Sequence, residues 1–201
     1  MHKTMTKRGR LSFSAYAQTP ADGKRYEYLG GEVYVSPTPS IAHQFTAKHL
    51  FLQIQPHFET PDSNTEVFFA PLTVILSDNP PDDAEIAVPD LVVVRERVTT
   101  PECRGIEGAP LVAIEIISPG RPWLDRKVKY ERYAANGVAH YWILNPMAET
   151  MECYRLVEGQ YVLDAVGTAD EKLDVLAFPG LKIDLITLWL RQDASKSQTA
   201  P

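Results

Sequence analysis

Apolar residues along this chain fall into short runs, and the lengths of these runs predict a sheet with helices packed on it. Residues 91–94 form one continuous apolar run, and residues 111–117 form a second run that contains a single glutamate. Such runs are typical of strands that are buried on both faces of a sheet. Residues 26–35 surround the turn signal Gly30-Gly31 and therefore predict two short strands.

The segment from residue 111 to residue 145 predicts the clearest structural unit. Its first strand ends before Pro119, a helix follows, and Asn136-Gly137 is a typical helix stop. Residues 139–145 then predict a second strand. A strand, a helix and a strand of this combined length indicate a right-handed crossover that joins two parallel strands.

Three further segments complete the expected elements. Residues 151–156 and 160–165 predict a β-hairpin, and residues 66–77 predict strand structure that a proline interrupts. Ser40 is expected to cap a helix that ends near residue 58. The apolar residues expected to form one buried stripe on this helix are Ile41, Phe45, Leu50, Leu52 and Ile54. The predicted fold class is α/β or α+β, with a mixed central sheet flanked by helices and an N-terminal strand hairpin as an extension.

The composition is that of an ordinary globular domain. Of the 201 residues 44% are hydrophobic, and 20 basic against 26 acidic residues give a net charge of −6. We expect one domain over residues 11–191, between a flexible tail at residues 1–10 and a disordered tail at residues 192–201. No apolar run reaches the roughly 18 residues that span a bilayer, and no export signal follows the basic N-terminus. A cytoplasmic protein without a membrane partner is therefore expected.

Two carboxylates stand at unusual places in the apolar runs. Glu115 lies in the middle of the second run, where an unpaired carboxylate costs several kcal/mol, and Asp90 directly precedes the first run. Two carboxylates on central strands can share one hard cation such as Mg²⁺, and the backbone carbonyl of Ile116 can add a third ligand. Two other interpretations stay open: an internal Arg or Lys satisfies Glu115, and Asp90 is only a turn residue at the strand entrance.

The helix after the second run carries Asp125, Lys129 and Tyr133, which are spaced four apart and therefore share one face. A lysine close to metal-binding carboxylates can orient an attacking water or stabilise charge on a phosphate. Between Arg121 and Arg132 there are five basic residues and two acidic ones, which predicts a contact with a nucleic-acid backbone. The alternative is a solvated helix face on which Asp125 and Lys129 form an ordinary ion pair.

Several sequence blocks support a more specific interpretation. In chain order they are YEYLGGEVYVSPTPSIAH, VPDLVVV, EIISP, DRKVKYERYAANGV and YWILNP. Together they resemble the PD-(D/E)xK phosphodiesterase superfamily, and more narrowly its Uma-type family of bacterial restriction-endonuclease-like proteins. The resemblance covers roughly residues 10 to 190. It implies a restriction-endonuclease-like fold and a nuclease site that depends on Mg²⁺ or Mn²⁺.

The resemblance also assigns candidate catalytic residues. Asp90 matches the motif aspartate and Glu115 matches the Asp/Glu of the second motif, so these two residues are expected to hold the metal. The superfamily lysine falls two positions after Glu115, where this chain has Ile117. The resemblance implies that a lysine of the following helix takes its place. Lys129 fits the family spacing, and Lys127 is the second candidate.

Five residues are expected to support the site. Superfamily members often bring a glutamate from an early element to the metal, which makes Glu27 or Glu32 a candidate. His43 matches a histidine of the N-terminal signature and is expected to hydrogen-bond a ligand carboxylate or a water, with a purely structural role as the alternative. Asp125 and Tyr133 are expected to support the orientation of the lysine.

These residues together predict a metal-dependent endonuclease that hydrolyses phosphodiester bonds in DNA. Branched DNA and RNA stay open as substrates, because the chemistry at phosphorus is the same. The alternative is a non-catalytic binding or assembly module that retains the nuclease fold, which Ile117 and the acidic isoelectric point of about 5.4 favour. A homodimer is also expected. Its candidate contact surfaces are the edge of the hairpin at residues 151–165 and the apolar segment 178–190, both of which are equally explained as core.

Overall fold

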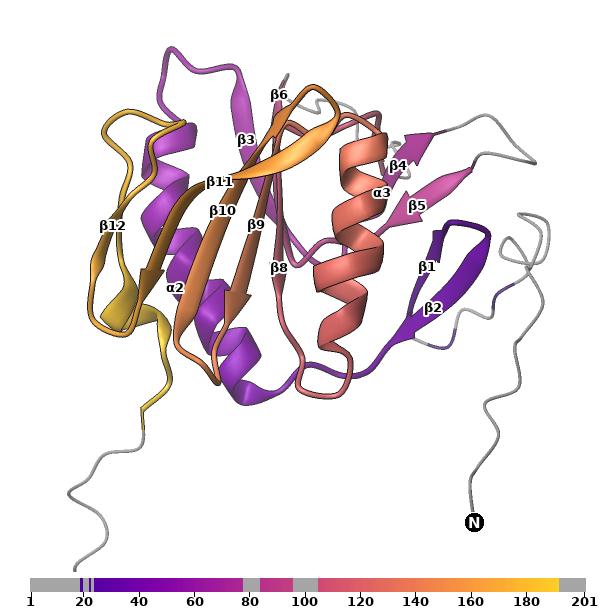
Figure 1. Cartoon of the computed structure of the whole chain (residues 1–201), viewed down its shortest axis with the longest axis horizontal. Coiled ribbons are helices and arrows are strands. Elements are labelled where there is room, and N and C mark those ends of the chain that lie inside the picture. Colours follow the sequence, from indigo (N-terminus) through magenta and orange to yellow (C-terminus); the bar gives the residue numbers. More distant parts are fainter. Residues whose placement is uncertain (1–18, 20–21, 23, 78–83, 96–104, 192–201) are drawn as a thin grey trace, which may run out of the picture.

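A six-stranded mixed sheet forms the centre of the structure, a computed structural model that describes residues 19, 22, 24–77, 84–95 and 105–191. The strands in chain order are β3 (Thr65–Phe69), β6 (Leu91–Arg95), β8 (Val112–Ile116), β9 (His140–Asn145), β10 (Thr150–Val157) and β11 (Gln160–Thr168). Their order in space is β11-β10-β9-β8-β6-β3, and Figure 1 labels each of these strands. Strands β8 and β9 run parallel, and the other neighbours in this sheet run antiparallel.

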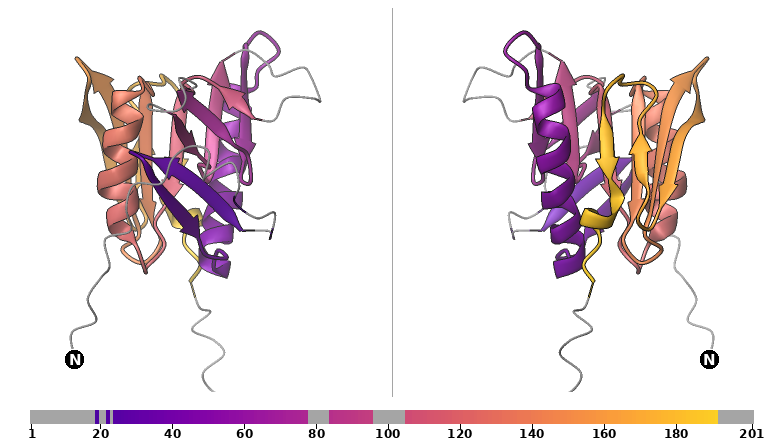
Figure 2. Two further views of the ribbon diagram at one scale, coloured as in Figure 1. Left: turned by 90° about the vertical axis from the view of Figure 1, so that its right-hand side faces the viewer. Right: turned by 90° about the vertical axis from the view of Figure 1, so that its left-hand side faces the viewer.

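The parallel pair β8–β9 confirms the predicted crossover. Between these strands the chain forms a π-helical segment η1 (Leu124–Lys129) that continues as the α-helix α3 (Tyr130–Ala135). The helix ends at Asn136, and Gly137 follows with a φ of 77°, a conformation that glycine adopts easily because it has no Cβ. Helix α3 lies on one face of the central sheet, and helix α2 (Ile41–Phe58) lies on the other face (Figure 2).

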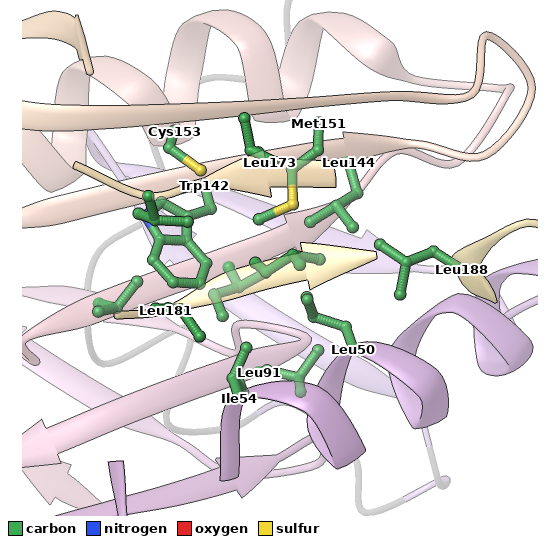
Figure 3. Packing of buried hydrophobic residues seen from close by; sticks show 14 of the residues in the cluster. Leu50, Ile54, Leu91, Trp142, Leu144, Met151, Cys153, Leu173, Leu181 and Leu188 are labelled. Carbon is green, nitrogen blue, oxygen red and sulfur yellow. The ribbon is translucent and has the colours of Figure 1, made fainter. Parts of the chain in front are cut away.

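The face that carries α2 holds the larger apolar cluster. Figure 3 shows Leu50 and Ile54 of α2 close to Leu91, with Trp142 and Leu188 in the same cluster. The C-terminal segment closes this face with β12 (Lys172–Asp174), β13 (Lys182–Asp184) and the 3₁₀ turn η2 (Leu185–Leu188). Within the predicted segment 178–190, most of the apolar residues belong to the core, and those that are buried are Leu181, Ile183, Leu185, Leu188 and Trp189.

The buried face of α2 differs from the predicted stripe. Ser40 caps the helix as predicted, because its Oγ accepts a hydrogen bond from the His43 N–H at 3.2 Å. The prediction was wrong for Ile41 and Leu52, which are 79% and 57% exposed. Leu52 lies two residues after Leu50 and two before Ile54, which both point to the core, so its side chain points to the other side of the helix. The buried residues follow one another every three or four positions, and they are His43, Thr46, Leu50, Ile54 and Phe58.

A smaller five-stranded sheet packs on the face that carries α3. Its strands are β1 (Arg25–Leu29), β2 (Glu32–Ser36), β4 (Val74–Ser77), β5 (Glu85–Ala87) and β7 (Ile106–Glu107), in the order β2-β1-β5-β4-β7. Strands β1 and β2 form the predicted hairpin across Gly30-Gly31. One apolar cluster joins Leu29 of this sheet to Val92 of the central sheet and to Tyr133 of α3.

The structure confirms the predicted hairpin of residues 151–165, but it does not describe the predicted tails. Strands β10 and β11 form the predicted hairpin, and β11 is an edge strand on which Leu163 and Val166 are exposed. The two predicted tails, residues 1–10 and 192–201, lie outside the described residues. Among the helices that the structure describes, none combines the length and the apolar character needed to cross a membrane.

Candidate active site

Two strands bring Asp90 and Glu115 together on the face of the central sheet opposite α2. The antiparallel register pairs Leu91 of β6 with Ile114 of β8, so the next step places Asp90 across from Glu115. Side chains alternate along a strand, and Ala113, on the same face as Glu115, belongs to the apolar cluster that includes α3. Both carboxylates are buried, and both line a cavity of about 140 Å³.

The carboxylate of Asp90 is held by three groups from different elements. Its Oδ1 accepts a hydrogen bond from Arg25 at 2.9 Å. Its Oδ2 accepts one from the Ile116 backbone N–H at 2.9 Å and lies 3.0 Å from His43 Nε2. Burial raises the pKa of this carboxyl, but the hydrogen bond and charge of His43 and the charges of Lys129 and Arg25 outweigh burial and lower the pKa to about 2. Asp90 is therefore ionised at neutral pH.

The carboxyl group of Glu115 has two partners from the helix above it. The Tyr133 hydroxyl donates a hydrogen bond to Oε1 at 2.7 Å, and the Lys129 Nζ lies 2.9 Å from Oε2. Burial raises the pKa of Glu115 well above 4.5; Lys129 opposes this shift, and the negative charges of Asp90 and Asp125 add to it. The structure thus agrees with the interpretation in which an internal lysine pairs with the buried Glu115.

Lys129 occupies the centre of the buried charges. Its Nζ lies 2.9 Å from Glu115, 3.0 Å from Glu27 and 3.7 Å from Asp125. Desolvation lowers the pKa of the ammonium group, but these neighbouring carboxylates raise it well above its usual value. Lys127, the second candidate, is exposed and does not line the cavity.

The helix brings Lys129 to Glu115, the carboxylate that lies two positions before Ile117. Ile117 is buried in the apolar cluster on the same face as Glu115. Asp125, Lys129 and Tyr133 are all buried on one side of the helical segment η1–α3, as their spacing predicted. The helical segment that holds Asp125 and Lys129 is π-helical, and π-helical turns are frequent at functional sites.

The N-terminal hairpin supplies one of the two candidate glutamates. Glu27 is fully buried, and it accepts a hydrogen bond from the Val88 backbone N–H at 2.9 Å in addition to the contact with Lys129. Glu32 is exposed and accepts a bond from the Tyr34 hydroxyl, so the structure does not bring it to the cavity. Glu32 pairs with Leu29 and so lies on the same face as Glu27, but it stands beside the turn on the edge strand β2, whereas Glu27 lies inside β1.

Arg25 is the site residue that the sequence analysis missed. It lies two residues before Glu27 on β1, so both side chains point the same way, and its guanidinium pairs with Asp90 at 2.9 Å. The sequence signal that could have identified Arg25 was a cation and a carboxylate two positions apart, at residues 25 and 27, near the start of a predicted strand. Its partner Asp90 is 65 positions away in the sequence, and no local pattern specifies that pairing.

Carboxyl groups outnumber fixed cations around this cavity. Burial, partly opposed by Lys129, raises the pKa of Asp125 to about 6, and the charges of Asp90 and Glu27 add to this shift. The three fixed positive charges are those of Lys129, Arg25 and Arg121. The four buried carboxyl groups are those of Glu27, Asp90, Glu115 and Asp125.

The donor set around the cavity fits a hard divalent cation. Carboxylate oxygens are the ligands that Mg²⁺ and Mn²⁺ prefer, and Asp90, Glu115 and Ile116 all line the cavity. Within the described ranges, no group of three His, Cys, Asp or Glu side chains is placed as a complete metal site. Waters or substrate oxygens would therefore complete the coordination, which is common for Mg²⁺.

The predicted basic patch is divided among three places in the structure. Arg121 lines the cavity and donates a hydrogen bond to the Val35 carbonyl at 3.1 Å. Arg126 is paired with Glu152, and Arg132 is paired with the buried Glu85. Of these three arginines, only Arg121 faces the candidate site.

Comparison with known proteins supports the fold and gives the family. The sequence profile of the Uma2 family, described as "Putative restriction endonuclease", matches residues 13–187. One similar crystal structure is that of "a putative nuclease belonging to DUF820" from Anabaena variabilis ATCC 29413. The TM-score is 0.71 at 19% sequence identity, over 89% of this chain and 97% of that chain, and this likeness confirms the predicted fold class.

The comparison with curated proteins found no match. The family profile, in contrast, extends over most of the sequence, including the segments that supply Asp90, Glu115 and Lys129. The chain belongs to the Uma2 family.

Proposed function

We propose that this protein is an endonuclease that hydrolyses phosphodiester bonds in DNA with Mg²⁺ or Mn²⁺ bound at Asp90 and Glu115. The observation that carries the proposal is the arrangement of three side chains. Asp90 and Glu115 line one cavity from neighbouring strands, and the Lys129 amine lies 2.9 Å from Glu115. The family description and the likeness to a structure described as a nuclease support the same activity.

Asp90 and Glu115 would hold the metal ion, with the Ile116 carbonyl as a third protein ligand. Bound there, the ion lowers the pKa of a water ligand and stabilises negative charge on the phosphate. The lowered pKa of Asp90 keeps this ligand ionised. Among the described residues its Oδ1 accepts a hydrogen bond only from Arg25, and a carboxylate oxygen has a second lone pair for another partner.

Lys129 would orient the attacking water or neutralise charge on the phosphate oxygens. Its ammonium group is fixed between Glu115 and Glu27, so its position is set before substrate arrives. Tyr133 holds Oε1 of Glu115, and this contact orients the carboxylate whose Oε2 faces the lysine. Asp125 adds a second carboxyl group near the amine and helps to keep it protonated.

A non-catalytic binding or assembly module is the second candidate. The ion pairs of Lys129 with Glu115 and Glu27, and of Arg25 with Asp90, partner these buried charges within the protein. These side chains can therefore stabilise the fold without any metal, which is the observation that favours a structural role.

In both proposals a homodimer in the cytoplasm would use the exposed edge of β11.

Nicking of supercoiled plasmid by the purified protein tests the proposal. We expect nicking with Mg²⁺ or Mn²⁺, none with EDTA, and none from the variants Asp90→Asn and Glu115→Gln. The variant Glu152→Gln is the matched control, because this carboxylate is also paired with an arginine but does not line the cavity. Metal-dependent nicking that survives in Asp90→Asn and Glu115→Gln would contradict the proposed site. A folded wild type that is inactive on plasmid, branched DNA and RNA would favour the binding module.

A further inference from the structure

A second cavity, of about 190 Å³, adjoins the candidate active site. Arg25, His43 and Asp90 line both cavities, so the second one begins where the carboxylate cluster ends. Its other walls come from the exposed side of α2 and from the end of β3. The residues that form these walls are Gln44, Ala47, Lys48, Phe51, Phe69 and Ala70.

Two phenylalanines give this cavity an aromatic wall. Phe51 of α2 is half-buried against the core, and Phe69 ends the edge strand β3 with 63% of its surface exposed. Their ring centroids are 5.6 Å apart and their planes are nearly perpendicular. The exposed ring of Phe69 adds little to the core from this position, but it offers a flat face to a ligand.

A wider groove connects the aromatic cavity with the carboxylate cavity. It has a volume of about 650 Å³, and it shares Gln44 and Ala70 with the aromatic cavity and Arg121 with the carboxylate cavity. Lys24, Arg25 and Arg121 line the groove, and none of its described lining residues is a carboxylate. A positively lined groove of this kind suits a chain of phosphates.

His43 provides a polar group at the junction of the two cavities. Its Nε2 is bound to Asp90, and its Nδ1 is buried without a hydrogen-bond partner among the described residues. A buried nitrogen without a partner costs free energy, and this nitrogen belongs to a side chain that lines both cavities.

We propose that the aromatic cavity binds an unpaired nucleobase next to the phosphate that is cleaved, so that the substrate is single-stranded or locally unpaired DNA. This inference rests on the proposed nuclease function. The base stacks on the exposed ring of Phe69, which Phe51 supports edge-to-face. Lys48 and Arg25 meet the flanking phosphates, and the groove carries the rest of the strand. Bases inside an intact duplex are stacked and paired, so they cannot enter a cavity without leaving the helix.

Aromatic stacking accepts any base, because every base has a flat π-face. The inference therefore predicts a preference for strand structure and little preference for sequence. The Gln44 amide is the side chain of this cavity best suited to hydrogen-bond a base edge.

Binding measured without metal tests the inference separately from hydrolysis. The probe is a short fluorescein-labelled DNA strand of mixed sequence, followed by fluorescence anisotropy in EDTA, beside the same strand in a duplex. Removing an aromatic ring that stacks on a base costs about 1–3 kcal/mol, so Phe69→Ala is expected to weaken single-strand binding about five-fold or more. The matched control is Leu163→Ala, a similarly exposed residue on β11 at the opposite edge of the sheet, which is expected to bind like the wild type.

Two further binding measurements complete the test, one with an abasic DNA strand and one with an RNA strand. A strand that is abasic throughout is expected to bind the wild type about as weakly as the intact strand binds Phe69→Ala. Equal binding of single strand and duplex, with no effect of Phe69→Ala, would overturn the inference even if plasmid is nicked. Tighter binding of an RNA strand than of the DNA strand would overturn the assignment to DNA. Phe69-dependent binding by a wild type that nicks nothing would support the nucleobase cavity and count against the hydrolytic function.

Discussion

At the scale of the residue, Lys129 balances the buried negative charges of the site. The variant Lys129→Met keeps most of the aliphatic stem and removes the ammonium that lies between Glu115 and Glu27. Removing one partner of a buried ion pair leaves the other charge uncompensated, so we expect the free energy of unfolding to fall by about 3–5 kcal/mol at pH 7. Urea denaturation followed by circular dichroism measures this loss.

The neighbouring variant Lys127→Met is the control for this loss. Lys127 belongs to the same helical segment but is exposed, and exposed substitutions usually change stability by less than about 0.5 kcal/mol. Equal losses for the two variants would mean that the charge of Lys129 is not what stabilises the cluster.

A second residue, Asp125, should make stability depend on pH. Burial raises its pKa from 3.8 to about 6 in the folded protein. The folded state therefore binds this proton more tightly than the unfolded chain, and the free energy of unfolding falls as pH rises from about 4 to about 6. The variant Asp125→Asn cannot ionise, so it is expected to lose this fall and to be more stable than the wild type by about 3 kcal/mol at pH 7.

Urea denaturation across this pH range in EDTA measures the effect of Asp125→Asn. Asp174→Asn is a suitable control, because Asp174 is an exposed carboxylate paired only at the surface with Lys182. A stability difference between the wild type and Asp125→Asn that stays constant between pH 4 and pH 6 would show that Asp125 ionises normally in the folded state.

At the scale of the element, strands were predicted better than the helix face. The period of two along the run 111–117 placed Glu115 on the same face as Ala113, and the structure has it there. In α2 the sequence offers apolar residues on several sides, so the stripe containing Ile41 and Leu52 was wrong. The helix buries the polar residue Thr46 instead, because its hydroxyl donates a hydrogen bond to the Leu188 carbonyl at 2.7 Å.

The end of α3 depends on one backbone conformation. Gly137 has a φ of 77°, and a Cβ added there would meet no atom within 4 Å, so the cost of Gly137→Ala is conformational alone. We expect a loss of about 1 kcal/mol in the free energy of unfolding. Gly120→Ala is the control, since a Cβ would have open space there too and no positive φ is involved. Gly120→Ala is expected to be neutral or slightly stabilising in the same denaturation experiment.

At the scale of the whole molecule, the site is assembled from segments that are far apart in the chain. Asp90 bonds to Arg25, His43 and the Ile116 backbone, which lie 65, 47 and 26 positions away. The sequence blocks indicated which residues belong to the site, but the pairs themselves arise from the packing of the β1–β2 hairpin and α2 against the central sheet. Local patterns carry no information about such contacts, which is why Arg25 was missed and Glu32 was included.

The same assembly predicts that a divalent cation stabilises the entire fold. The cavity is surrounded by more carboxyl groups than cations, and an ion that binds only the folded state raises its stability by RT ln(1 + [L]/Kd). At a metal concentration one hundred times Kd this amounts to about 2.7 kcal/mol. For a chain of this length each kcal/mol raises Tm by roughly 2–4 °C, so Mn²⁺ is expected to raise Tm by about 5–10 °C.

A thermal unfolding series with increasing Mn²⁺ measures this shift, and two variants locate it. Asp90→Asn and Glu115→Gln each remove a carboxylate that lines the cavity and are expected to abolish the metal-dependent increase in Tm, whereas Glu152→Gln is expected to retain it. Since the shift requires binding and not turnover, it separates a metal site from hydrolytic activity. A wild type whose Tm does not respond to Mn²⁺ would mean that Lys129 and Arg25 already neutralise the cluster, and the structural role of these carboxylates would then be the better explanation.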